Sequence, residues 1–114
     1  MKDVSLITYT VADVAKAKLF FSELIGVDPY VDSPRYVGYK SGDMEIGLVP
    51  SGDNGAPLAI PYWTVSDIAA SVQALVAAGG AIVQDVMDVG YGLLVASLKD
   101  PNGSMVGLRQ MPKG

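Results

Sequence analysis

The sequence predicts an α+β fold built from two copies of one βαβββ unit. The stretch Thr10–Val14 (TVADV) returns later in the chain as Thr64–Ile68 (TVSDI). In both places, alternating strand-like residues lead through an Asp into a helix-period pattern that ends in glycine. A second echo, in which Ile46–Leu48 (IGL) returns as Val106–Leu108 (VGL), follows at a slightly larger offset. Two copies of one unit therefore fill the chain.

The first copy opens with a strand and a capped helix. Val4–Val11 alternates between two faces, as a half-buried strand does. Asp13 suits the helix N-cap, because its carboxylate can accept an unpaired amide of the first turn, and Gly26 can close the helix in a left-handed conformation. The expected apolar stripe of this helix is Val14, Ala17, Phe21, Leu24 and Ile25.

The rest of the first copy is β structure that leads into a linker. The prolines within residues 27–34 leave room for a short strand, and a hairpin follows across residues 41–43. The stretch 51–57 is dense in turn residues. We therefore expect a single domain in which module one spans residues 1–50, the linker 51–57, and module two 58–114.

The second copy repeats this order. Leu58–Val65 should form its first strand and Asp67 its helix cap, and Gly79–Gly80 should end the helix. The expected stripe of the second helix is Ile68, Val72, Leu75 and Val76. The three further strands are expected at Ala81–Val86, Tyr91–Leu98 and Ser104–Gln110.

Composition narrows the class of protein. At 114 residues with 50% hydrophobic content, the chain can bury a core. Its net charge is −4, and its eight Lys and Arg form no cluster, which argues against a nucleic-acid partner. No apolar run reaches the roughly 18 to 20 residues of a bilayer span, and the first residues do not resemble a secretory signal. We therefore expect a cytoplasmic protein without a membrane partner.

Two residue types are missing altogether. The chain has no Cys, which excludes disulfides and thiolate chemistry, and no His, which removes the commonest general base and the commonest metal ligand.

Several motifs resemble those of the glyoxalase, bleomycin resistance and extradiol dioxygenase superfamily, also called vicinal oxygen chelate. They are the two helix entries, the helix end FFSELIG at residues 20–26, and DPNGSMVGL at residues 100–108. The resemblance covers almost the whole chain. It implies that the strands of both modules form a curled mixed sheet, a half-barrel cup with the helices on its outer face, and that the protein is a homodimer.

The resemblance also implies a divalent metal at the bottom of the cup, held by the first and last strands of each module. The corresponding positions are Leu6, Gly47, Ile60 and Gly107. None of these side chains can ligate a cation, so we expect neither a metal nor another cofactor. A shifted alignment would bring in Glu45, but one carboxylate does not make a metal site.

Strand alternation then predicts what lines the cup instead. Residues that share a face with the four former ligand positions point inward, and Tyr91 lies in a glycine-flanked connection that could form a flap. The candidate ligand-binding residues are Thr8, Glu45, Tyr62, Thr64, Tyr91, Met105 and Arg109. Glu45 is also the candidate catalytic residue. A mostly apolar concavity with a few polar groups is typical of a small-molecule site.

Each candidate also has a plainer interpretation. Glu45 and Arg109 could form a rim salt bridge contributing ~0–1 kcal/mol. Tyr62 could pack its ring against the sheet, Met105 could fill a gap, and Tyr91 could belong to an ordinary turn.

Three functions fit these observations. The first is a metal-free protein that holds a small, partly apolar ligand in the cup. The alternative is an enzyme of the superfamily, of lyase, isomerase or dioxygenase type, either with a displaced metal site or with Glu45 as base and Tyr62 or Arg109 stabilising negative charge. The third is a structural or partner-binding module whose interior is filled by side chains.

Overall fold

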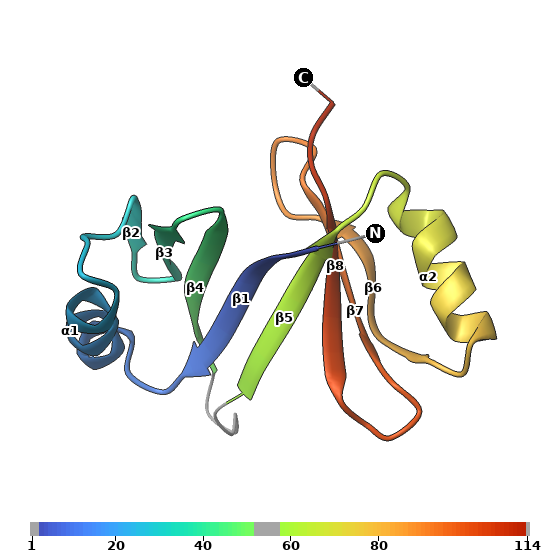
Figure 1. Cartoon of the computed structure of the whole chain (residues 1–114), viewed down its shortest axis with the longest axis horizontal. Coiled ribbons are helices and arrows are strands. Elements are labelled where there is room, and N and C mark those ends of the chain that lie inside the picture. Colours follow the sequence, from blue (N-terminus) through green and yellow to red (C-terminus); the bar gives the residue numbers. More distant parts are fainter. Residues whose placement is uncertain (1–2, 52–57, 114) are drawn as a thin grey trace. The chain divides into compact units, whose positions relative to one another are not determined.

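The computed structural model describes residues 3–51 and 58–113. The chain divides into two compact units, one comprising Ser5–Ile60 and the other Pro61–Gly114 with Met1–Val4. Apart from Ser51, the expected linker lies outside the described residues. Each unit carries one helix and a sheet (Figure 1).

The first unit has the predicted βαβββ order. Its strands follow the spatial order β2-β3-β4-β1, with β1 parallel to β4 and the other pairs antiparallel. The first and last strands are therefore neighbours, and Leu6 lies opposite Glu45 while Thr8 lies opposite Gly47. The elements are β1 (Val4–Val11), α1 (Val14–Ile25), β2 (Val31–Ser33), β3 (Tyr36–Ser41) and β4 (Met44–Pro50).

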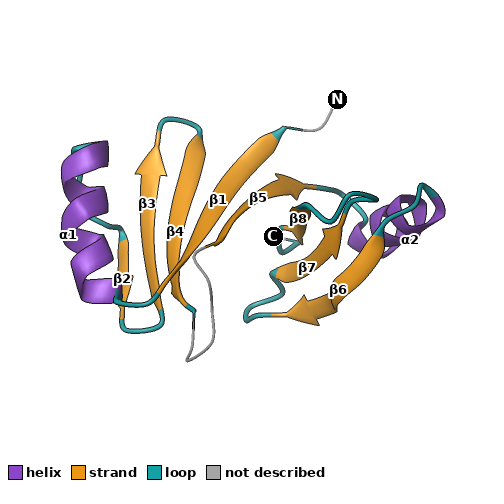
Figure 2. Cartoon of the chain, turned by 90° about the horizontal axis from the view of Figure 1, so that it is seen from below, coloured by secondary structure: helices purple, strands orange, loops and turns teal. Residues whose placement is uncertain are grey.

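The second unit repeats the arrangement with the strand order β5-β8-β7-β6. Here β5 is parallel to β8, and β8 and β6 are antiparallel to β7. The elements are β5 (Leu58–Thr64), α2 (Ile68–Ala77), β6 (Ala81–Asp88), β7 (Leu94–Lys99) and β8 (Met105–Gln110). The predicted fold class, α+β with two βαβββ modules and a mixed sheet, is confirmed (Figure 2).

Both helices begin at the predicted aspartates. The Asp13 carboxylate accepts a hydrogen bond from the Lys16 amide at 3.0 Å, and the Asp67 carboxylate accepts one from the Ala70 amide at 3.1 Å. Gly26 closes α1 in the left-handed region, with φ of 84°. In the described part of the chain, no helix has the length and apolar content that a bilayer crossing requires.

The helix α1 covers one face of the first sheet (Figures 1 and 2). Val37, Tyr39 and Leu48 are buried beneath it. The Tyr39 hydroxyl donates to the Lys18 carbonyl at 3.1 Å and shares a second hydrogen bond with Ser22 at 2.7 Å. Tyr39 is therefore a core residue that ties the sheet to α1.

A salt bridge joins α1 to β2 at the surface. Lys18 Nζ lies 2.5 Å from Asp32 Oδ2. The hydrogen bond that Lys18 donates to the Asp32 carboxylate is the largest cause that raises the pKa of Lys18 above its ordinary value. The contribution of the Lys18 charge to stability is present at neutral pH and is lost as the pH rises through that raised pKa.

The second core lies between α2 and its own sheet. Ile68 and Val72 are the buried residues of the helix. They pack on those strand residues whose side chains point toward α2. The cluster is Val65, Ile68, Val72, Ala96, Leu98 and Leu108.

The structure differs from the sequence-based expectations in the helix stripes. Leu24, Leu75 and Val76 were expected to be buried, but they are 67%, 37% and 43% exposed. Each sheet covers a narrower arc of its helix than the predicted stripe. These residues lie at the edge of the stripe, outside the covered arc.

In the second unit, two strand boundaries differ from the predicted ones by two residues or more. β6 continues to Asp88, beyond the predicted Val86. β7 begins at Leu94 instead of Tyr91, because Gly90, Tyr91 and Gly92 all have positive φ, which an extended strand does not allow.

The second core gives a direct prediction. Leu98 is 1% exposed, so Leu98→Ala removes buried apolar volume and should lower the free energy of unfolding by roughly 2–5 kcal/mol. The matched control is Leu19→Ala on α1. Leu19 is 77% exposed, so this substitution should change the free energy of unfolding by less than about 0.5 kcal/mol. Urea unfolding monitored by circular dichroism measures both. Equal effects would contradict this description of the core.

Candidate functional site

The sheet face opposite α1 carries the candidates of the first unit. Tyr9 packs against Phe21 of α1, with ring centroids 4.9 Å apart, so its strand neighbours point to the other face. Thr8 is 7% exposed on that face, and Glu45 on β4 is half-buried. Because β1 and β4 are paired in register, Thr8 and Glu45 occupy neighbouring positions on one surface.

Two glycines on this face form a floor of bare backbone under a tyrosine ring. Gly38 and Gly47 lie opposite each other in the β3–β4 ladder, and the ring of Tyr36 lies over both. A Cβ added at Gly47 would come within 2.5 Å of the Tyr36 hydroxyl oxygen, and one at Gly38 within 2.9 Å of the same ring. Glycine is needed at both positions because only a bare backbone lets the ring approach this closely.

Glu45 belongs to a charged and aromatic cluster beside this floor. The Tyr30 hydroxyl donates a hydrogen bond to the Glu45 carboxylate. Lys40 lies opposite Glu45 across the hairpin, and its Nζ is 4.9 Å from the centroid of the Tyr30 ring, where a cation–π interaction is favourable. We call Tyr30, Tyr36, Lys40 and Glu45 the Glu45 cluster.

Sequence analysis missed three members of the Glu45 cluster. The hairpin register could have indicated Lys40, because it places that residue opposite Glu45, and alternation along β3 could have indicated Tyr36. Tyr30 lies in the connection before β2, where no periodicity predicts the direction of a side chain.

In the second unit, the sheet face opposite α2 carries a comparable arrangement. The Tyr62 ring lies over Gly107, its partner in the β5–β8 ladder, closer than a Cβ there would allow. Arg109 is 8% exposed, and its Nε donates to the Thr64 hydroxyl at 3.2 Å. Ser97 is also buried and lies opposite Gly107 on β7. The structure therefore brings Tyr62, Thr64 and Arg109 together on one surface.

Two candidates of the second unit remain, Met105 and Tyr91. Met105 is half-buried at the start of β8. Tyr91 is fully exposed in the connection between β6 and β7. Its φ is 54°, and among the residues that the structure describes no other non-glycine residue has a positive φ. The Gly90 amide donates to Asp88 at 2.8 Å, and the Leu93 amide to Gly90 at 3.0 Å, so this connection is a hydrogen-bonded turn.

Comparison with known families agrees with this architecture. The family model described as the Glyoxalase/Bleomycin resistance protein/Dioxygenase superfamily matches residues 4–108, which is most of the chain. The chain belongs to this superfamily. No curated protein matches the sequence.

Several solved structures share the fold of this chain at low sequence identity. A hypothetical protein, BH1468 from Bacillus halodurans C-125, has a TM-score of 0.80 at 14% identity, with 99% of this chain and 96% of that chain covered. A superfamily member from Vibrio splendidus 12B01 has a TM-score of 0.69 at 16% identity, with 96% and 98% covered. Methylmalonyl-CoA epimerase from Mycobacterium tuberculosis has a TM-score of 0.71 at 16% identity, with 97% and 88% covered. At such identities the likeness shows the fold alone.

The metal that superfamily membership suggests does not fit the residues of this chain. The four positions that the sequence-based resemblance assigns to metal ligands carry Leu6, Gly47, Ile60 and Gly107, and none of these residues has a side-chain donor atom. At both glycines, the space that a ligating side chain would use is taken by a tyrosine ring. Within the described residues, no group of three or more His, Cys, Asp or Glu side chains could hold a metal ion.

The contact between Tyr62 and Gly107 predicts strong coupling between the two positions. Gly107→Ala places a methyl group against the Tyr62 ring, and overpacking of this kind costs about 1–3 kcal/mol of stability. In a Tyr62→Ala background, the same substitution meets no ring and should be neutral or slightly stabilising. A double-mutant cycle in urea measures the difference. Additive effects would show that the ring does not lie on Gly107.

Proposed function

We propose that this superfamily member is a metal-free protein that binds a small, partly apolar molecule. Each unit by itself offers a surface for such a ligand on the sheet face opposite its helix. One observation carries the proposal. At positions 47 and 107, where a ligand to a cation would stand, glycine supports a tyrosine ring. A ring over bare backbone offers a flat apolar surface for a ligand, and it takes the space that a ligating side chain at that position would use.

The first unit supplies groups that suit such a ligand. Tyr36 contributes a half-buried aromatic surface, and the Glu45 carboxylate beside it is a hydrogen-bond acceptor whose orientation is held by Tyr30. Lys40 adds a positive charge within reach of the same cluster. A planar molecule with a hydrogen-bonding edge matches these groups, because aromatic rings stack with an offset and leave their edges accessible.

The second unit supplies a complementary set. Arg109 puts a positive charge on a mostly buried surface, with Thr64 accepting from its Nε. Tyr62 provides the ring, and Thr64 a hydroxyl. A ligand with a carbonyl, carboxylate or other acceptor group fits an arginine in such surroundings.

The alternative function is an enzyme in which Glu45 acts as base. One observation favours it: the Glu45 carboxylate accepts a hydrogen bond from Tyr30, and a carboxylate held in this way can accept a proton from a bound substrate. Methylmalonyl-CoA epimerase is among the proteins with a similar fold. The homodimer, the cytoplasmic location and the third possibility, a structural module, stay predictions from the sequence.

A thermal-shift screen against small metabolites and glycopeptide antibiotics tests the binding function. A ligand present at 100 times its Kd stabilises a protein by about 2.7 kcal/mol, which corresponds to a rise in Tm on the order of 10 °C for a domain of this size. Glu45→Gln keeps the shape and removes the charge, so it should weaken binding of a polar ligand by about tenfold or more. The matched control is Glu23→Gln on exposed α1, which should leave the shift unchanged.

Metal dependence is decided in the same assay. Because no metal takes part in the proposed binding, the ligand-induced rise in Tm should be the same with and without EDTA. A stoichiometric metal that survives dialysis, together with a shift or a turnover that EDTA abolishes, would exclude the metal-free function. Ligand turnover that Glu45→Gln abolishes and EDTA does not affect would establish the enzyme instead.

A further inference from the structure

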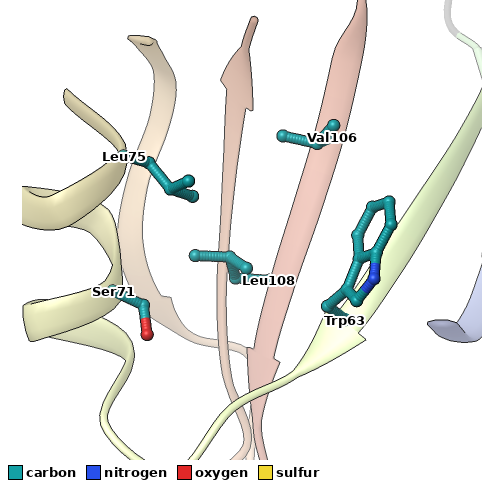
Figure 3. Close-up of a pocket in the computed structure, with 5 residues that line it drawn as sticks. All are labelled: Trp63, Ser71, Leu75, Val106 and Leu108. Carbon is teal, nitrogen blue, oxygen red and sulfur yellow. The ribbon is translucent and has the colours of Figure 1, made fainter. Parts of the chain in front are cut away.

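A cavity lies between α2 and its own sheet, on the face that the proposed ligand does not use. Its volume is about 270 Å³, and it is lined by Trp63, Ser71, Leu75, Val106 and Leu108. Figure 3 shows the Leu75 side chain reaching from α2 toward Val106 and Leu108 on β8, with the Trp63 ring standing on β5. Trp63 alternates with Tyr62 and Thr64 along β5, so the cavity and the Arg109 surface are on opposite faces of the sheet.

The internal repeat provides a filled version of the same place. Each lining residue has a counterpart in the first unit, given by the two offsets of the repeat. One offset maps Thr10 onto Thr64, and the other maps Gly47 onto Gly107. The pairs are Tyr9 with Trp63, Ala17 with Ser71, Phe21 with Leu75, Ile46 with Val106, and Leu48 with Leu108. All five counterparts pack together in the first core, where the Tyr9 and Phe21 rings are in contact at 4.9 Å.

The two cores therefore differ by an aromatic ring. In the first unit, Phe21 fills the space between the helix and Tyr9. In the second unit, Leu75 stands at the Phe21 position and is 37% exposed, while Trp63 and Ser71 are only half-buried. The empty volume lies where the repeat predicts a phenyl group.

The walls define the chemistry of what would fill this volume. No charged side chain lines it, and the polar groups on its walls are the Ser71 hydroxyl and the Trp63 indole. A cavity of about 150 Å³ lined by aliphatic and aromatic side chains is enough to bind benzene. The Trp63 ring offers an aromatic surface for edge-to-face or offset stacking. The partial exposure of Leu75 and Trp63 gives a small molecule a way in.

We propose that this cavity is a second binding site, specific for an uncharged aromatic molecule whose ring takes the place that the Phe21 side chain holds in the first unit. The site is independent of the proposed function, because it uses the opposite sheet face and different residues.

Trp63 is the one tryptophan of the chain, so its fluorescence reports on the cavity directly. The experiment titrates the whole protein with toluene, ethylbenzene, propylbenzene and butylbenzene and follows Trp63 emission. Binding should be saturable. The Kd should fall by about fourfold for each added methylene until the cavity is full, because each buried CH₂ contributes a constant transfer free energy.

Two variants locate the site. Leu75→Phe restores the ring found in the first unit, and it should raise the Tm while weakening butylbenzene binding by about tenfold or more. Ser71→Leu fills the cavity from a different position and should also weaken binding. The matched control is Leu19→Phe, at an exposed position of α1, which should bind like the wild type.

Three results would overturn the proposal. One is the absence of a saturable change up to the solubility limit of butylbenzene. Another is wild-type affinity in both folded cavity variants. The third is a combined result: without hydrocarbon, Trp63 emission depends on protein concentration, and sedimentation shows a dimer that both variants disrupt. A second copy of the chain would then cover the cavity.

Discussion

The central constraint on this chain is that each sheet has a helix on only one of its faces. Strand alternation then divides every strand into two sets of side chains with different surroundings. Leu48, Tyr39 and Leu108 face a helix and form the cores, whereas Thr8, Glu45 and Arg109 face away from it. The parallel pairs β1–β4 and β5–β8 hold the two faces in register, because they bring together the first and last strands of each unit.

This constraint explains why much of the fold could be predicted from the sequence. The period of two in the strands and the repeat of TVADV as TVSDI are visible without any structure. The aspartate caps are local, since Asp13 and Asp67 each accept from an amide three residues ahead. Face assignment follows from the same period, which placed Thr8, Glu45 and Arg109 correctly on the face opposite the helices.

The remaining features depend on information that periodicity does not contain. Tyr30 reaches Glu45 from an irregular connection, and its direction is set by backbone angles that no pattern encodes. The positive φ at Tyr91 delays the start of a predicted strand by three residues, to Leu94. The hydrophobic pattern of the two helices is similar, but the second core has Leu75 where the first has the larger Phe21. A pattern of apolar positions does not record this difference in side-chain volume, so it could not predict the cavity beside Leu75.

The tyrosine rings over Gly47 and Gly107 also affect what mutation can do to this protein. Replacing either glycine with histidine in a single step would drive the new side chain into a ring, so the variant would lose stability before it gained a ligand. Shortening Tyr36 or Tyr62 first opens the space at the cost of an aromatic contact. Gain of a metal-donor side chain at either position would therefore be ordered, with loss of the tyrosine ring preceding gain of the donor.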